Sequence, residues 1–212
     1  KVLADSAITL QTQVRTIERL LLSSAGHIEL INTGNLVLTE AQTFDGAITL
    51  STYGSLLVTA ARTLGSSDAN DMVFTTTQAP VTAPAVKAAA GMVIGMLSNQ
   101  GRGDVVLNAQ GAITKAGSSL ILADTLTVDV SMVGLSAAGQ PWLLDLATKV
   151  NTLNLRTQGA VGSSLQALLT ITGIFPQGYG IVFLPKAQPG QPAERYEFAI
   201  VNSLYPPSPE TP

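Results

Sequence analysis

Side chains that could carry out acid–base chemistry are few in this chain. Its 212 residues include 14 acidic residues, one histidine and no cysteine. Without cysteine the chain cannot form a disulfide framework, a thiolate metal site or a thiol nucleophile. With His27 as its single histidine it cannot build a histidine-based metal site, and any catalytic triad would have to use His27. We therefore expect no metal site, no cofactor and no enzymatic activity.

Two acidic residues, Asp68 and Asp71, lie in a short segment rich in oxygen-bearing side chains, residues 65–71. Carboxylates at this spacing suit a calcium-binding loop, or the acid and base pair of a hydrolase or lyase. Asp, Asn, Ser and Gly are equally the standard residues of an ordinary turn. The composition favours the turn, and Asp68 and Asp71 stay as candidate binding residues.

The tripeptide Arg102, Gly103 and Asp104 is a second candidate, because some host-binding adhesins present this sequence to integrins. It falls at a predicted turn, where a short recognition motif is accessible. Matches of three residues also arise by chance, so an ordinary turn is the favoured alternative. Trp142 could stack on a sugar ring, although a lone tryptophan more often anchors packing.

These candidates belong to a chain that repeats itself at short intervals. The pattern Gly-x-Ile-x-Leu begins at residue 26 and again 20 residues later, and each copy has a second glycine eight residues on. A third copy begins at residue 103, with valine and leucine in the two aliphatic positions. Three copies in phase indicate a structural repeat. The glycines that mark it are Gly26, Gly34, Gly46, Gly54, Gly103 and Gly111.

Each copy alternates apolar and polar residues, which is typical of a half-buried strand. Ile28 and Leu30 would point inward while His27 and Glu29 point to solvent. Strand, glycine turn, strand and glycine turn, closing after about 20 residues, is the length of one solenoid coil. With 46% hydrophobic but only 5% aromatic residues, the chain suits thin aliphatic layers. The sequence therefore predicts an all-β fold, a right-handed parallel β-helix.

The predicted organisation has three parts. Residues 1–160 form the β-helix repeat region, interrupted by an excursion at 64–100. Within it, the apolar residues of Ala79 to Leu97 have near-helical spacing, which favours a short helix or a segment that covers one face. Residues 161–204 form terminal coils or a small β extension, and the proline-rich segment 205–212 is a linker.

Composition also restricts the classes of partner that the chain is expected to have. The net charge of -3 is small and spread along the chain, without the basic stripe that nucleic acids require. No apolar run reaches the roughly 18 residues that span a bilayer, so we expect no membrane span.

The Gly-x-Ile-x-Leu pattern, followed by a glycine and a Leu-Val-Leu-Thr strand, resembles the repeats of filamentous haemagglutinin-type exoproteins. These are large β-helical adhesins that bacteria export by two-partner secretion. The resemblance covers Leu20 to Ala61 well, Gly103 to Val130 fairly and the last fifty residues poorly. It implies an extracellular or cell-surface rod that binds a host-surface protein or glycan and stacks on adjacent repeats of its parent chain.

Two other functions stay open for such a rod. One is a polysaccharide-active β-helix domain, a lyase or a tailspike-like glycosidase, which would need a cluster of carboxylates on one face. The other is a self-assembling fibre subunit, because the uncapped end of a solenoid is an open ladder that can pair with another chain.

Overall fold

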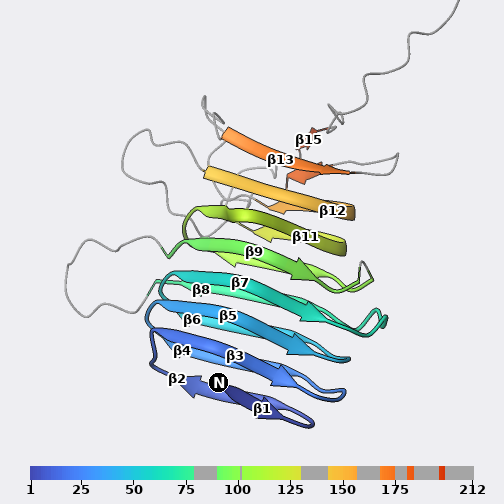
Figure 1. Ribbon diagram of the computed structural model, residues 1–212. Coiled ribbons are helices and arrows are strands. Elements are labelled where there is room, and N and C mark those ends of the chain that lie inside the picture. The colour runs from blue at the N-terminus through green and yellow to red at the C-terminus, as the bar shows by residue number, and fades with distance from the viewer. Residues whose placement is uncertain are drawn as a thin grey trace, which may run out of the picture.

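The predicted parallel β-helix is confirmed. The computed structural model consists of strands, with no helix among the described residues, and successive coils stack as parallel strands in one 13-stranded sheet (Figure 1). The chain climbs from β1 at the N-terminus to β13 at the opposite end of the stack. The described residues are 1–78, 90–100, 102–129, 143–156, 168–174, 181–183 and 196–198.

Each coil contributes one strand to each of two faces. What we call the even face is made of β2 (Ile8–Thr12), β4 (Ile28–Thr33), β6 (Ile48–Tyr53), β8 (Met72–Thr77) and β10 (Val105–Ala109). The odd face is made of β1 (Val2–Ala4), β3 (Thr16–Leu22), β5 (Leu36–Thr43), β7 (Leu56–Thr63) and β9 (Met92–Ser98).

Two longer strands and one shorter strand continue the stack above these coils. The first part of β11 (Ile113–Asp129) pairs with β9 and its last part with β10, so this strand crosses from the odd face to the even face. Next to it lie β12 (Leu143–Arg156) and then β13 (Leu168–Ile174), both parallel. A separate antiparallel pair joins β14 (Ile181–Phe183) and β15 (Tyr196–Phe198).

The core is a set of aliphatic columns, because every inward residue stacks on its counterpart one coil away. Ile28 pairs with Ile8 on one side and Ile48 on the other, and both Ile28 and Ile48 are at most 1% exposed. His27 and Glu29 are exposed, so the predicted inward and outward alternation is confirmed. Burying one such aliphatic side chain contributes about 1.5–3 kcal/mol. The columns therefore hold the coils in register.

Strands of the odd face bend in the middle, which shifts the alternation by one residue. In β5, Leu38 and Ala41 are both buried while Thr39 and Glu40 between them lie on the outside. A bend thus separates two buried residues by three positions, as one turn of a helix does.

This bend explains an incorrect prediction. A helical interpretation of Ala79 to Leu97 is wrong from Met92 onward, because Met92–Ser98 is strand β9. Its buried Ile94 and Leu97 have helical spacing only because they flank the bend. Residues 79–89 lie outside the described residues.

The predicted excursion at 64–100 contains two strands of the stack, β8 and β9. Its first connection makes the coil longer: stacked residues are 20 positions apart between Gln42 and Arg62 but 24 apart between Gly46 and Asn70. Of the predicted extension at 161–204, three strands are described, and the segment 205–212 lies outside the described residues. Across the described residues, no helix is both long enough and apolar enough to cross a membrane.

Candidate functional site

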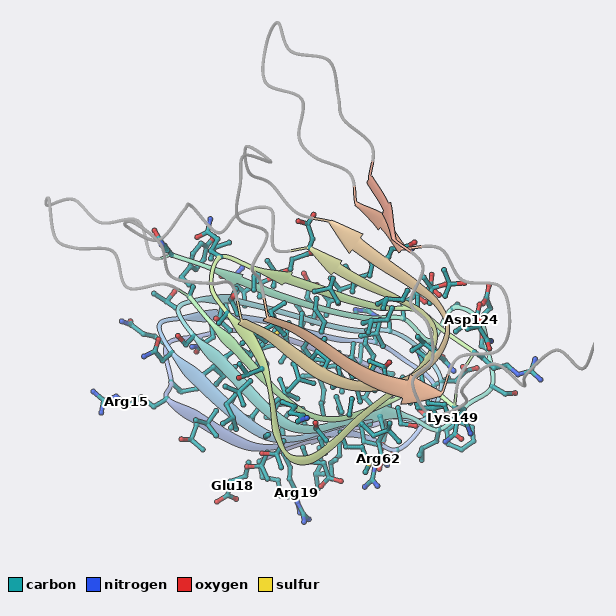
Figure 2. The ribbon with its side chains drawn as sticks, turned by 90° about the horizontal axis from the view of Figure 1, so that it is seen from above. Arg15, Glu18, Arg19, Arg62, Asp124 and Lys149 are labelled. Atoms are coloured by element: carbon teal, nitrogen blue, oxygen red, sulfur yellow. The ribbon has the colours of Figure 1, made fainter. Side chains whose placement is uncertain are left out.

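Two corners join the even face to the odd face, at opposite ends of the cross-section. In the view along the stack, Arg15 marks one end and Asp124 the other (Figure 2). We call the first end the Asn32 corner and the second the Asn99 corner. Polar side chains point inward at both. The inward side chains of the Asn32 corner are Thr12, Asn32, Thr52 and Thr76, and those of the Asn99 corner are Thr43, Thr63, Asn70 and Asn99. The half-buried Asp45 also lies at the Asn99 corner.

All five candidate binding residues lie on the connections of the Asn99 corner. Asp71 comes directly before β8 and Asp104 directly before β10, which stack on one another. The Asp71 Oδ1 atom accepts a hydrogen bond of 2.9 Å from the Asp104 backbone N–H. In turn the Asp104 Oδ1 atom accepts one of 3.2 Å from the N–H of Thr125. Both carboxylates therefore link neighbouring coils, 33 and 21 residues apart in sequence.

Asp68 is exposed and has no hydrogen bond or ion pair with these carboxylates in the described part of the chain. It lies in a turn, where the Asn70 N–H donates to the Ser67 carbonyl at 3.3 Å and the Ala69 N–H to the Ser67 hydroxyl at 3.2 Å. The structure thus brings Asp71 and Asp104 together and leaves Asp68 apart. A turn at residues 67–70 agrees with the favoured sequence interpretation.

The Arg102–Gly103–Asp104 tripeptide also lies in a turn, closed by a 3.2 Å hydrogen bond from the Arg102 N–H to the Asn99 carbonyl. Its three residues differ in accessibility: Arg102 is exposed, Gly103 is buried and Asp104 is half-buried. A Cβ atom on Gly103 would lie 2.5 Å from the Asn70 carbonyl oxygen, so only glycine fits there. Of the tripeptide, the guanidinium of Arg102 is thus the group most open to a partner.

The glycines of the repeat lie at the corners. Gly34 has a φ of 100° and Gly46 a φ of 137°, backbone angles that other residues seldom adopt. They differ in their surroundings. A Cβ on Gly46 would lie 2.2 Å from the Gly26 carbonyl oxygen, whereas one on Gly34 would contact nothing within 4 Å.

At the Asn32 corner the inward polar atoms are paired. Asn32 accepts from the Thr12 hydroxyl at 2.8 Å and the Val14 N–H at 3.0 Å, and its amide donates to the Gly34 carbonyl at 3.0 Å. The hydroxyls of Thr52 and Thr76 donate to carbonyls further along their own coils at 2.8 and 2.7 Å. Each of these side chains is thus paired within the protein.

At the Asn99 corner many inward polar atoms have no partner. Thr43 donates to the Gly26 carbonyl at 2.7 Å, and the Asn70 Oδ1 atom accepts from the Gly46 N–H at 2.7 Å. The atoms without a partner among the described residues are Asp45 Oδ1, Thr63 Oγ1, Asn70 Nδ2, Asn99 Nδ2 and Asn99 Oδ1.

The outer surfaces of the two faces differ in charge. On the odd face Glu40 pairs with Arg19 at 3.2 Å and with Arg62, whose Nε atom also donates to Gln42 at 2.7 Å. Arg19 and Arg62 project from this face in the view along the stack (Figure 2). Outward residues of the even face are mostly hydroxyl and amide side chains in two columns, with Thr9, Glu29, Thr49, Val73, Val106 and Thr127 in one and Gln11, Ile31, Ser51, Thr75, Asn108 and Asp129 in the other.

Comparisons with known proteins give no family. No protein-family model matches the chain, and neither a curated protein nor a solved structure shows significant similarity to it. What the site can do therefore has to be argued from its own geometry.

Groups that could hold a metal ion or transfer a proton were sought among the described residues. Within the described ranges no three His, Cys, Asp or Glu side chains come together in a way that could hold a metal ion. A hollow of about 440 Å³ lies at the N-terminal end of the stack and includes a single carboxylate, that of Asp5. Trp142, the candidate sugar platform, lies outside the described residues.

The two polar corners were not predicted from the sequence, although a signal for one was present. Thr12, Asn32 and Thr52 follow one another at 20-residue intervals, the same interval as the glycines. Threonine and asparagine are also common in turns, so residue type alone does not indicate that these side chains point inward. Their repeat spacing, rather than their type, indicates that they stack inside.

Proposed function

We propose that this chain is a non-enzymatic segment of a large secreted or cell-surface repetitive protein, where it acts as an adhesin stalk or binding surface. The observation that carries the proposal is the filled interior. Inward residues such as Leu30, Leu50 and Phe74 are 0% exposed, so the interior of the described coils is occupied by apolar side chains that are closed to solvent. A partner is then bound on the outer faces and turns.

The even face is the part of this surface that suits an extended partner. Its hydroxyl and amide side chains repeat at the coil spacing of about 4.8 Å. Tyr53 is 42% exposed at its edge and offers an aromatic ring with a hydroxyl. Groups that donate and accept hydrogen bonds around an aromatic ring suit a host-surface glycan or the backbone of a host protein.

The ends of the stack suit adjacent repeats of the same parent chain. β1 pairs only with β3 and β2 only with β4 among the described strands, so each has one open edge. Leu3, which lines the hollow beside β1, is 62% exposed. A further coil would pair with these edges and cover the hollow, as each coil covers the next within the stack.

The alternative of a polysaccharide-active enzyme is weakened by the carboxylates themselves. Asp71 and Asp104 are the candidate acids that lie together, and an oxygen of each accepts a backbone hydrogen bond from the next coil. An acid and base pair for glycoside cleavage needs both carboxyl groups directed at one substrate bond. Here each of the two carboxylates instead accepts a hydrogen bond from the backbone of a different coil.

The experiment is a binding and turnover assay on arrays of glycans and matrix proteins. We expect retention of a ligand without release of product. A variant carrying Ser51→Arg and Thr75→Arg should lose retention, because two long charged side chains then cover the even face. The matched variant Arg102→Ala removes the exposed side chain of the tripeptide and should still retain the ligand.

Release of cleaved sugar that disappears in Asp68→Asn or Asp71→Asn would contradict the proposal and favour the enzyme. If Arg102→Ala loses the ligand while the double variant keeps it, the binding surface lies at the Asn99 corner and not on the even face.

A further inference from the structure

We propose that the Asn99 corner is an internal binding site for ordered water molecules, which complete the hydrogen bonds of its side chains. Seven buried side-chain nitrogen and oxygen atoms have no partner among the described residues, and five of them belong to this corner. Buried polar groups are nearly always paired with protein or with ordered water. Five such atoms at one place therefore point to a bound partner.

The residues that carry the five atoms lie on neighbouring coils. Thr63 and Asn99 follow the paired residues Arg62 and Ser98, so they lie on neighbouring rungs, about 4.8 Å apart. Asn99 and Asn70 both adjoin Gly103: a Cβ there would lie 3.1 Å from Asn99 Nδ2 and 2.5 Å from the Asn70 carbonyl oxygen.

Asn70 connects these residues to the part of the site that lies nearer the N-terminal end of the stack. Its Oδ1 atom is held by the N–H of Gly46, so its Nδ2 atom is the free end of the amide. Asp45 precedes Gly46, and its unpaired Oδ1 atom lies 2.7 Å from the position of a Cβ on Gly65. The unpaired atoms therefore follow one corner of the stack over successive coils.

The chemistry of these atoms selects water over a cation. Asn70 and Asn99 each offer an amide N–H, Asp45 and Asn99 each offer an acceptor oxygen, and the Thr63 hydroxyl can do either. A water molecule donates two hydrogen bonds and accepts two, so it can satisfy both kinds. A metal ion would face the amide N–H groups, which repel it.

The Asn32 corner provides the internal control. It has the same residue types at the same depth, with Asn32 and Thr52 at most 1% exposed, but their hydrogen bonds are made within the protein. Because protein groups already pair these atoms, the Asn32 corner has no need of bound water.

The test is oxygen-17 magnetic relaxation dispersion on the intact chain, which counts water molecules that stay bound for longer than the protein takes to tumble. We expect long-lived waters in the unaltered chain and the loss of at least one in Asn99→Leu, which removes both unpaired atoms. Thr63→Val, a smaller change, should lower the same signal. The matched variant Thr52→Val at the Asn32 corner should leave the count unchanged, and circular dichroism checks that each variant is folded.

The proposal is wrong if the unaltered chain has no long-lived water, or if folded Asn99→Leu and Thr63→Val both keep its full count. It is also wrong if a metal ion stays bound in proportion to the protein after dialysis against a chelator and is lost in Asn99→Leu.

Discussion

The Asn32 corner and the Asn99 corner turn the same chain with similar residues, yet five buried polar atoms of the second have no partner among the described residues. At the Asn32 corner, Asn32, Thr52 and Thr76 donate to the carbonyls of Gly34, Gly54 and Ala90. Each carbonyl lies two residues before the next strand, including Ala90, which follows a much longer connection. Because each acceptor carbonyl keeps its place just before a strand, the hydrogen bond is kept even where the connection is longer.

At the Asn99 corner the connections also differ in length. β5 and β6 are joined by residues 44–47, β7 and β8 by residues 64–71, and β11 crosses the corner without a break. Thr43 finds the Gly26 carbonyl, but Thr63, its counterpart one coil later, finds no partner in the described structure. The comparison teaches that the Asn32 corner keeps its polar atoms paired across connections of very different length, whereas the Asn99 corner does not. The candidate binding residues lie at the Asn99 corner.

The largest difference between the corners is expected in the free energy of unfolding that is lost when a glycine is replaced. Gly46→Ala should lower the free energy of unfolding by about 3 kcal/mol, because the new Cβ meets the Gly26 carbonyl oxygen and the backbone angle is unfavourable. Gly34→Ala meets no atom within 4 Å and should cost about 1 kcal/mol, for its backbone angle alone. Urea denaturation followed by circular dichroism measures both. Equal losses would mean that the coils do not approach one another closely at Gly46.

A smaller contrast is expected for the asparagines. Asn32→Leu removes three hydrogen bonds and leaves their partners unpaired, so it should cost about 2 kcal/mol or more. Asn99→Leu removes an amide that bonds no protein group among the described residues, and should cost less than about 1 kcal/mol. The same urea titration compares them. A larger loss for Asn99→Leu than for Asn32→Leu would show that the Asn99 amide has a protein partner in solution.

The sequence predicted the regular coils well, for a physical reason. From β4 to β7 each coil keeps its 20-residue length, so alternation and glycine spacing stay in phase. The strand β9 was missed because the bend at Gly95 places two buried residues three apart, and alternation alone cannot distinguish that from a helix.

The candidate site was predictable only in part. Asp71 and Asp104 were both selected, but their contact across 33 residues depends on the length of the connections between them, and no local pattern specifies that length. Whether the polar atoms of the Asn99 corner find a partner depends in the same way on where each connection rejoins the stack.

The central claim, a rod of stacked coils in one register, is tested most directly by distances along the even face. Thr9 lies four rungs from Val106, five from Thr127 and six from Asn154. Since the chain has no cysteine, cysteine pairs at these positions accept spin labels without background. Double electron–electron resonance should give distances that rise by about 4.8 Å per rung, from about 19 to about 29 Å between the backbones. Distances that do not increase in this order would contradict the stacked register.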